Sequence, residues 1–402
     1  MPDGGEAISV QVLGAIAEAP AAAWDACAGT DNPFVGHAFL SALEDSGSAV
    51  AEHGWQPRHL VVPDRDGGFL GVVPLYLKSH SYGEYVFDWG WADAYERAGG
   101  AYYPKLQACV PFTPVTGPRL LVRPDADTDA VATALIAAMV EITRRYEISS
   151  LHVTFCTQDD WTRLGAAGFL QRIGRQFHWQ NRGYGCFDDF LGGLASRKRK
   201  AIRKERRKVA ESGIVLRTLS GEAIEPGHWD AFHRFYLATA ERKWGNPYLT
   251  RDFFHRLGET MAERVVLILA EDRGKPVAGA FNLLGSDALY GRNWGALGHY
   301  RFLHFEACYY RAIEFAIERG LSRVEAGAQG EHKIQRGYLP VETYSAHWIR
   351  DQGFRDAVAQ FVDRERQAVR QEIEALANGA GARRRLAARN GVVLHHFEDR
   401  GR

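Results

Sequence analysis

The chain has 402 residues, of which 46% are hydrophobic and 24% are charged, with 49 basic side chains balanced by 49 acidic ones. This length predicts two or three domains. The balanced charge excludes a protein whose whole surface coats nucleic acid, although it leaves local patches open. The five cysteines have no CxxC spacing, which favours reduced thiols over a disulfide framework or a zinc site.

No stretch of the sequence approaches the roughly 20 apolar residues that cross a bilayer. The first twenty residues lack the basic start of a secretory signal, and Glu6 and Glu18 interrupt their apolar run. We therefore expect a cytoplasmic protein without integral membrane association.

The first half of the chain alternates short strands and helices. Apolar spacing and turn residues predict a strand and a short helix within 1–30, a helix at 34–45, strands at 58–63 and 69–78, a helix at 130–146 and a strand at 151–155. Residues 92–129, rich in Tyr, Phe and Pro, read as a long irregular stretch.

The composition changes sharply at Ser196. Residues 196–208, SRKRKAIRKERRK, contain nine basic side chains and one acid, without Gly or Pro. They predict a highly charged helix between two globular blocks. Such a helix can contact tRNA, lie on an acidic membrane surface or only be solvated, and no stacking aromatic residues of an RNA-binding motif accompany it.

The second block again mixes strands and helices. The expected elements are a strand at 214–219, helices at 228–243 and 250–262, strands at 265–271 and 276–284, and a strand, helix and strand with two polar loops over 289–339. An apolar stripe from Phe354 to Ile373 predicts a final helix, and the Arg- and Ala-rich tail after it is expected to be loosely held.

The sequence contains an internal repeat. Residues 168–179, GFLQRIGRQFHW, and 337–348, GYLPVETYSAHW, both read Gly, aromatic, Leu and, after seven residues, His-Trp. A helix running into a strand precedes each segment, and the stretches that begin at Gly71 and Gly279 are also parallel. Three parallels in the same order predict two copies of one α/β unit.

The two copies differ in length. Gly71 and Gly168 are 97 positions apart, whereas Gly279 and Gly337 are 58 apart. The aromatic, Pro-rich stretch at about 91–129 is the simplest insertion, and it either covers the other copy's cleft or packs on its own sheet. We expect a first domain at 1–190, a basic helical connector at 191–212, a second domain at 213–376 and a flexible tail at 377–402.

Antiparallel strands, a central strand, a helix and a further strand make the plan of the GNAT acyltransferase fold. Two such units with a basic helical connector resemble the Fem-type peptidoglycan aminoacyltransferases and, more closely, the bacterial FemAB-like proteins of peptidoglycan biosynthesis and recognition. The segments that carry the resemblance are SHSYGEYVFDWGWADAY (Ser79–Tyr95), RKWGNPYLT (Arg242–Thr250), YGRNWGA (Tyr290–Ala296), LHFEACYY (Leu303–Tyr310) and EAGAQGEHKIQRGY (Glu325–Tyr338). The resemblance implies an α/β fold of tandem GNAT-like units. It also implies an N-acyltransferase that acts on an amine of a small molecule or of a peptidoglycan or cell-envelope precursor.

The resemblance leaves two donors open. Ordinary GNAT enzymes hold the acyl-CoA pyrophosphate with a Q/R-x-x-G-x-G/A turn, where this chain reads ALGHYRFLHFEA. Fem-type proteins also lack a clean version of that turn and use aminoacyl-tRNA. His299, Tyr300 and Arg301 stand in its place and are our candidates for contacts to acyl-CoA or aminoacyl-tRNA. No tightly bound cofactor is expected.

Acyl transfer to an amine needs a proton acceptor, a stabilised oxyanion and two substrates held together. Glu306 is the preferred general base. His304 lies two residues earlier, which points it to another helix face. Lys333 falls at the lysine of the Fem-type Phe-Lys motif, and the resemblance implies that it counters charge in the transition state. The structural alternatives are a carboxylate that stabilises a helix N-terminus and a solvated loop lysine.

Further candidates for substrate binding lie on the same loops and on aromatic runs expected to wall the cleft. They are Arg292, Trp294, Trp244, Glu325, Gln329, Glu331, His332 and Arg336, with Asp88 and Trp89 as counterparts in the first copy. Arg336 and His332 suit phosphate or carboxylate, whereas Glu325 and Gln329 suit an acceptor amine. Core packing is the alternative for each Trp.

One other class of function stays open, and a second is not expected. A non-catalytic protein that recognises peptidoglycan precursor or RNA fits the missing pyrophosphate turn. A metal site is not expected, because His299, His304, Glu306, Glu331 and His332 lack HExxH or any other established ligand spacing. We expect a monomer or a homodimer.

Overall fold

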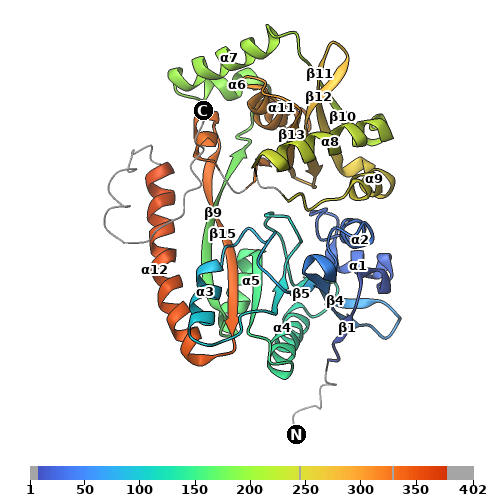
Figure 1. Cartoon of the computed structure of the whole chain (residues 1–402), viewed down its shortest axis with the longest axis vertical. Coiled ribbons are helices and arrows are strands. Elements are labelled where there is room, and N and C mark those ends of the chain that lie inside the picture. The colour runs from blue at the N-terminus through green and yellow to red at the C-terminus, as the bar shows by residue number, and fades with distance from the viewer. Residues whose placement is uncertain (1–7, 244–245, 328–329, 378–402) are drawn as a thin grey trace.

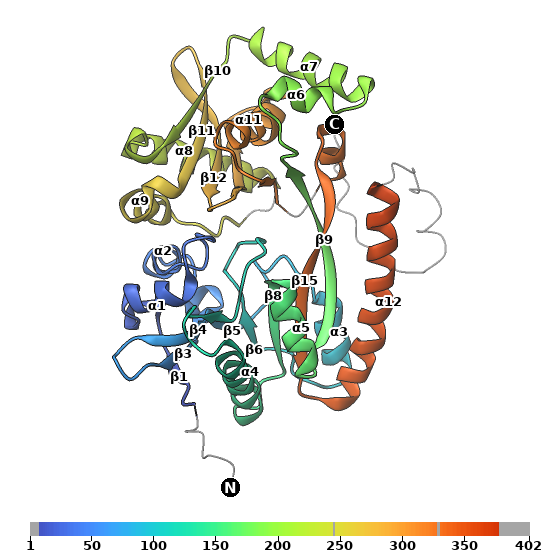
Figure 2. The same ribbon diagram turned by 180° about the vertical axis from the view of Figure 1, so that it is seen from behind.

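The computed structural model describes residues 8–243, 246–327 and 330–377. Figure 1 shows two lobes with two long strands, β9 (Leu170–Gln180) and β15 (Leu339–Ile349), running between them. Helix α12 (Gln352–Ala377) lies alongside these strands, and Figure 2 shows the same arrangement from behind. Within the described ranges, no helix combines the length and apolar character needed to cross a bilayer.

The first lobe is built from the first half of the chain. Its strands are β1 (Gln11–Leu13), β2 (Trp55–Pro57), β3 (His59–Pro63), β4 (Phe69–Val73), β5 (Leu75–Lys78), β6 (Lys105–Ala108), β7 (Leu121–Val122) and β8 (Ser150–Cys156). Its helices are α1 (Ala21–Ala28), α2 (His37–Asp45), α3 (Trp89–Arg97), α4 (Thr128–Arg145) and α5 (Gln158–Ala166). Side-chain caps begin the last two helices, since Asp127 accepts from the Ala130 amide and Thr157 from the Asp160 amide.

The second lobe follows α6 (Phe187–Gly192) and the basic helix α7 (Ser196–Ala210). Its strands are β10 (Val215–Ser220), β11 (Val265–Asp272), β12 (Lys275–Leu284), β13 (Ala288–Ala296) and β14 (Arg323–Glu325). Its helices are α8 (Pro226–Lys243), α9 (Arg251–Thr260), α10 (Leu303–Phe305) and α11 (Arg311–Glu318). A π-helical turn, Glu306–Tyr310, joins α10 to α11, and a 3-10 turn, Glu331–Arg336, follows β14.

One sheet of eleven strands crosses both lobes in the order β10-β11-β12-β13-β14-β9-β15-β8-β6-β5-β2. A second sheet has the order β1-β3-β4-β7. Strand β9 follows the first lobe in sequence but pairs with β14 of the second lobe, and β15 follows the second lobe but pairs with β8 of the first. The two copies have therefore exchanged their last strands.

The exchanged strands confirm the tandem duplication predicted from the repeat. They pair antiparallel, with Gly174 opposite Thr343. These residues hold the same position in the two repeat segments, six residues after Gly168 and Gly337. An approximate two-fold axis therefore passes between them and relates the two GNAT-like copies.

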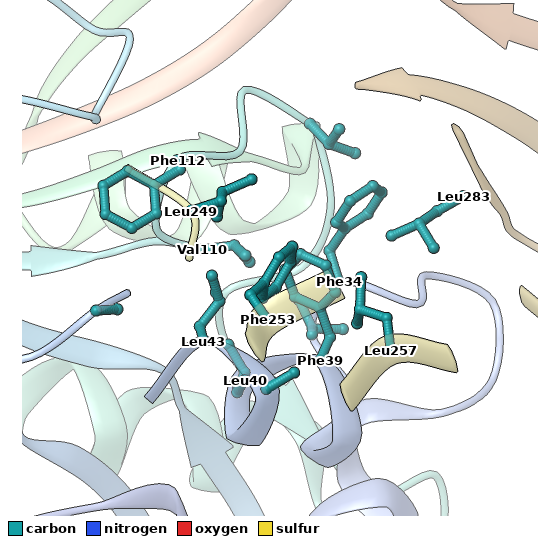
Figure 3. Close-up of a cluster of buried hydrophobic side chains, with 14 of the residues drawn as sticks. Phe34, Phe39, Leu40, Leu43, Val110, Phe112, Leu249, Phe253, Leu257 and Leu283 are labelled. Atoms are coloured by element: carbon teal, nitrogen blue, oxygen red, sulfur yellow. The ribbon is translucent and has the colours of Figure 1, made fainter. Parts of the chain in front are cut away.

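Apolar side chains join the lobes in a shared core. Figure 3 shows Phe39 and Leu43 of α2 beside Phe253 and Leu257 of α9. The rings of Phe39 and Phe253 meet edge to face with their centroids 5.8 Å apart. A hydrophobic contact of this kind between domains limits their relative motion, and so it sets the geometry of any site between the lobes.

Two expectations for the first copy are wrong. The stretch 92–129 was expected to be irregular, but it contains β6, which lies between β8 and β5 in the large sheet. The strand has only four residues, and its two polar side chains, Lys105 and Gln107, are buried, which their residue types do not predict. Trp89 begins α3, whereas Trp294 lies on β13, so these residues are not structural counterparts. The predicted tail from 378 onward lies outside the described residues.

Candidate active site between the lobes

A cavity of about 400 Å³ lies where β13, β14 and the crossing strands face the first lobe. Its walls are Asp31, Asn32, Thr116, Gly117, Pro118, Thr157, His178, Asp287, Tyr290, Arg323, Glu325, Val341 and Glu342. Four carboxylates and one guanidinium are among them, so the wall is acidic. Of the predicted site residues, the structure brings Glu325 to this cavity.

Glu325 ends β14, and its side chain is only 4% exposed. Arg323 Nε donates to Glu325 Oε1 at 2.9 Å. Glu325 Oε2 is buried at the cavity wall and has no hydrogen-bond partner among the described atoms. A buried carboxylate oxygen without a donor is costly to maintain, which marks it as a position where a ligand can bind.

His178, from the crossing strand β9, faces Glu325 with its Nε2 3.7 Å from Oε2. Gln176 Nε2 donates to the carbonyl of Pro114 at 2.6 Å, so Gln176 Oε1 faces His178 Nε2 at 3.2 Å. His178 Nε2 therefore carries the hydrogen. Burial lowers the pKa of His178 below 6.5. Its imidazole is thus neutral at pH 7 and leaves the charge of Glu325 uncompensated on the Oε2 side.

Lys333 lies just beyond β14, in the 3-10 turn. Its Nζ donates to the carbonyls of Ala326 at 2.5 Å and Gly327 at 2.9 Å. The residue is 3% exposed. Burial penalises the ammonium and lowers the pKa of Lys333 to about 7. Charged and neutral forms are therefore both populated near neutral pH, beside the backbone that follows Glu325.

Strands β13 and β14 part at this point. They pair only as far as Tyr290 and Glu325, while β13 continues to Ala296. The equivalent strands of the first copy, β6 and β8, part after Ala108. There the insertion occupies the gap, because Gly117 N donates to Phe155 O at 3.0 Å and Arg119 Nε donates to Thr154 O at 3.0 Å. The insertion thus closes the opening of its own copy, and its residues Thr116, Gly117 and Pro118 also line the cavity between the lobes.

The two-fold relation also places His152 and His347 of the first copy where Glu325 and His178 stand in the second. The two Nδ1 atoms are 2.7 Å apart, and Trp91 of α3 packs against His347 with ring centroids 4.9 Å apart. Asp88 belongs to this interior cluster, is 3% exposed and accepts from Tyr102 at 2.7 Å. The prediction that Asp88 binds substrate does not fit this position inside the first lobe.

Glu306, the predicted general base, is 4% exposed and pairs with the basic helix. Arg206 Nε of α7 lies 3.2 Å from each carboxylate oxygen, and Arg206 Nη2 lies 3.0 Å from Oε1. Burial raises the pKa of Glu306, and Arg206 acts in the opposite direction. Glu306 does not line the cavity. These contacts support an anchor for α7 and argue against a general base.

Arg336 is also committed to α7. Its Nη2 lies 2.9 Å and 3.1 Å from the two oxygens of Glu205, and its guanidinium stacks 3.4 Å from the centroid of Phe305. Lys198 of α7 donates to the carbonyl of Ile334 at 3.0 Å. These bonds hold the turn that carries Lys333, and they engage both Nη atoms of Arg336, whereas its buried Nε has no partner among the described atoms.

The outer face of α7 carries exposed basic side chains. They are Arg197, Lys200, Arg203, Lys204, Arg207 and Lys208. Arg203 pairs with Asp188 at 3.1 Å and Lys208 with Glu211 at 2.7 Å, both at the exposed surface. One face of α7 therefore binds the second lobe while the other presents a row of positive charge, which we call the α7 basic face.

Trp294, His304 and His332 lie close to Tyr309, near the start of the helix that follows β13, whereas Arg292 points to the first lobe. His304 packs between Trp294 and Tyr309, with ring centroids 5.4 Å from each. The hydroxyl of Tyr309 and His332 Nε2 are 2.9 Å apart. Arg292 reaches the first lobe, where its Nη2 donates to the carbonyl of Phe112 at 2.6 Å. Burial lowers the pKa of Arg292 to about 10.

The remaining predicted residues lie elsewhere. His299 and Arg301 are exposed, Tyr300 is partly buried after β13, and Trp89 is 36% exposed on the first lobe. Trp244 and Gln329 lie outside the described residues, as does the side chain of Glu331. In the part of the chain that the structure describes, no group of three or more His, Cys, Asp or Glu side chains is arranged to hold a metal ion.

Sequence reasoning missed His178, Arg323, Asp287 and Tyr290. The repeat flagged His178 as a shared residue, but its approach to Glu325 depends on the strand exchange, which has no sequence signature. Arg323 lies two residues before Glu325 on β14, and alternation along a strand would have placed both on one face.

The sequence matches the FemAB-like family, described as peptidoglycan biosynthesis and recognition, over residues 15–384. The chain belongs to the FemAB-like family. This FemAB-like chain resembles the crystal structure of FemX with a TM-score of 0.54 and 13% identity, over 88% of this chain and 100% of FemX. The C-terminal domain of a putative lysylphosphatidylglycerol synthetase from Agrobacterium fabrum gives 0.53 and 9%, over 86% and 96% of the two chains.

A tandem GNAT protein from the clavulanic acid biosynthesis pathway has a TM-score of 0.45 and 12% identity, over 85% of this FemAB-like chain and 98% of that chain. No curated protein matches the sequence. The predicted family and the predicted α/β fold of tandem GNAT-like units are both confirmed.

Proposed function

We propose that this FemAB-like protein is an N-acyltransferase that moves an acyl or aminoacyl group to an amine where β13 and β14 part. The observation that carries the proposal is the setting of Lys333. Its Nζ is buried against two loop carbonyls and has no ion pair with a described side chain. A cation that is not already neutralised is suited to an oxyanion that develops beside it.

The reaction follows from this geometry. The amine nitrogen attacks the acyl carbonyl carbon, and protonated Lys333 stabilises the oxygen as it gains negative charge. The new C–N bond remains when the C–O bond of an aminoacyl ester, or the C–S bond of a thioester, breaks. One proton leaves the nitrogen for the leaving group, so the products are an amide and a free hydroxyl or thiol.

The donor is an aminoacyl-tRNA or an acyl-CoA. The α7 basic face supports the tRNA, because exposed Lys and Arg contact phosphates without reading bases. Neutralising Lys200, Lys204 and Lys208 to Gln should weaken tRNA binding and reduce the slope of log K against log salt by roughly two. Binding to vesicles of anionic lipid tests whether the α7 basic face contacts a membrane surface instead of tRNA. If the triple substitution leaves the salt dependence of tRNA binding unchanged, α7 is not part of the tRNA site.

The acceptor is an amine on a small molecule or on a peptidoglycan precursor, and the family description supports the precursor. The full chain should be incubated with panels of acyl-CoAs, aminoacyl-tRNAs and amine acceptors that include muramyl peptides, and amide products measured by mass spectrometry. K333M should lower turnover at least about a hundredfold, whereas the exposed matched control K204M should keep it with acyl-CoA. Equal turnover by K333M would refute this role.

A recognition protein without catalysis is the second candidate, and the engagement of Glu306 and Arg336 by α7 favours it. This candidate requires that a peptidoglycan precursor or RNA raises the melting temperature, with a stabilisation that grows with the logarithm of ligand concentration above Kd. It also requires that no acyl donor yields an amide product. Formation of amide product by the wild-type chain would eliminate this candidate.

A further inference from the structure

The acidic cavity has a feature that the proposed reaction does not yet use. Glu325 Oε2 is buried in its wall and lacks a hydrogen-bond donor. All three nitrogens of Arg323 are already engaged, since Nε donates to Glu325 Oε1 at 2.9 Å, Nη1 pairs with Asp287 and Nη2 donates to Tyr290 at 3.2 Å. These bonds use three of its five N–H groups, and none of the five reaches Oε2.

The charges around the cavity favour one class of ligand. Asp31, Asp287 and Glu342 join Glu325 in the wall, and these four carboxylates face two guanidiniums, since Arg323 pairs with Asp287 and Glu325 and Arg370 pairs with Glu342 at 3.1 Å. Neutral His178 adds no positive charge, because burial lowers its pKa below 6.5. A group that donates hydrogen bonds and carries positive charge fits this wall, whereas a carboxylate or phosphate is repelled.

We infer that the cavity is the subsite for the acceptor, and that it takes a primary ammonium on an alkyl chain with Glu325 Oε2 as its proton acceptor. The inference rests on the proposed function for its catalytic part. A volume of about 400 Å³ suits a small amine or the amine-bearing end of a larger molecule. An amine beside a carboxylate, as in a free α-amino acid, is a poor ligand because the acidic wall repels that carboxylate.

The proton balance is complete. The ammonium gives one proton to the Glu325 carboxylate and becomes a neutral amine, whose lone pair can attack. After the C–N bond forms, the second proton leaves the nitrogen for the oxygen or sulfur released by the donor. Glu325 then returns its proton to water. Overall, the ammonium and the acyl donor yield the amide, the free hydroxyl or thiol, and one proton.

The position of Lys333 suits two separate roles, in which Glu325 accepts a proton from the amine and Lys333 stabilises the acyl oxygen. Glu325 and the carbonyls that bind Lys333 are consecutive in the chain, at residues 325, 326 and 327. Burial and, to a smaller extent, the charges of Arg323 and Lys333 lower the pKa of His178, so Lys333 lies near the histidine that faces Glu325 in the cavity wall. An acyl group held beside Lys333 is therefore near the amine in the cavity.

The test uses the full chain and calorimetric titration with n-pentylamine, n-pentanol and norvaline, without any donor. Pentylamine should bind, whereas pentanol and norvaline should bind at least about tenfold more weakly. E325Q should weaken pentylamine binding by roughly tenfold to hundredfold. E318Q, which changes an exposed acid on α11 outside the cavity, should leave it unchanged.

Equal binding of pentanol, or equal pentylamine affinity in E325Q, overturns the inference. If E325Q does not fold, the comparison of the three ligands on the wild-type chain still decides. Amine binding as expected without amide from any donor leaves the subsite standing and removes the proposed function. If the wild-type chain forms an amide and E325Q keeps the same kcat/KM for the amine, the proposed function stands and the role of Glu325 in the subsite is refuted.

Discussion

Lys333→Met isolates the cost of burying one ammonium in the second lobe. In the unfolded chain Lys333 holds its proton up to pH 10.5, whereas burial lowers the pKa in the folded protein to about 7. Between these values the unfolded state binds more protons, so stability rises with pH across this window. Below pH 7 both states are protonated and the slope vanishes. The substitution to Met removes this dependence.

The size of the effect follows from the two pKa values. Each pH unit at which the two states differ by one proton contributes about 1.4 kcal/mol. Between pH 7.5 and 9.0 the wild-type free energy of unfolding should therefore rise by about 2 kcal/mol more than that of K333M. Lys78 and Glu84, whose pKa values are also about 7, titrate in both proteins and cancel in the comparison.

The assay is urea unfolding of wild type, K333M and K204M at both pH values. K204M removes an exposed lysine of α7 and should follow the wild type. If K333M and wild type gain the same free energy between the two pH values, Lys333 is not a buried, partly neutral amine. Its proposed role as an uncompensated cation would then lose its physical basis.

Three further substitutions test the frame around the site. R206M removes the nearest partner of buried Glu306, leaves it Arg311 Nε at 3.5 Å, also removes the partner of Glu314, and should lower the free energy of unfolding by about 3 kcal/mol in urea titrations. R119M leaves several buried carbonyls of the first copy without donors, among them that of Gly117 in the cavity wall, and should cost about 3–5 kcal/mol by the same measurement. G295A places a Cβ 2.4 Å from the backbone of Phe235 and should lower the melting temperature, with a loss of about 2 kcal/mol or more.

Matched changes make these results interpretable. R197M removes an exposed arginine of α7, the helix that carries Arg206, and should keep the free energy of unfolding within about 0.5 kcal/mol of the wild type. G227A adds a Cβ in open space at the start of α8 and should not destabilise. Wild-type stability in R206M would contradict the buried ion pair, in R119M the buried hydrogen bonds, and in G295A the close packing.

Sequence reasoning reached the architecture because the repeat leaves a visible record. The His-Trp ends of residues 168–179 and 337–348 mark two equivalent strands, and family segments such as YGRNWGA confirm the copies. It missed β6, since this strand has only four residues and buries two polar ones, Lys105 and Gln107. It could not show the strand exchange, because pairing partners of strands distant in sequence depend on the whole fold.

The candidate site was predicted in part for the same reason. Glu325 was identified because it stands at the end of a strand, where functional groups commonly lie, and Lys333 because of the resemblance to the Fem-type Phe-Lys motif. Glu306 was given a chemical role because nothing in its local sequence reveals Arg206, a hundred residues earlier. His178 gained meaning only when β9 was seen beside β14.

The exchange of last strands also has a consequence for synthesis of the chain. The first lobe's sheet ends at β8, which is complete at Cys156, but its neighbour β15 is complete only at Ile349. At roughly 5–20 residues per second, the ribosome needs about 10–40 s to supply that strand. During this interval the edge of β8 is unpaired and open to wrong partners. Neither half should fold when expressed alone. The two copies therefore form one cooperative folding unit, which is complete only after β15 has been synthesised.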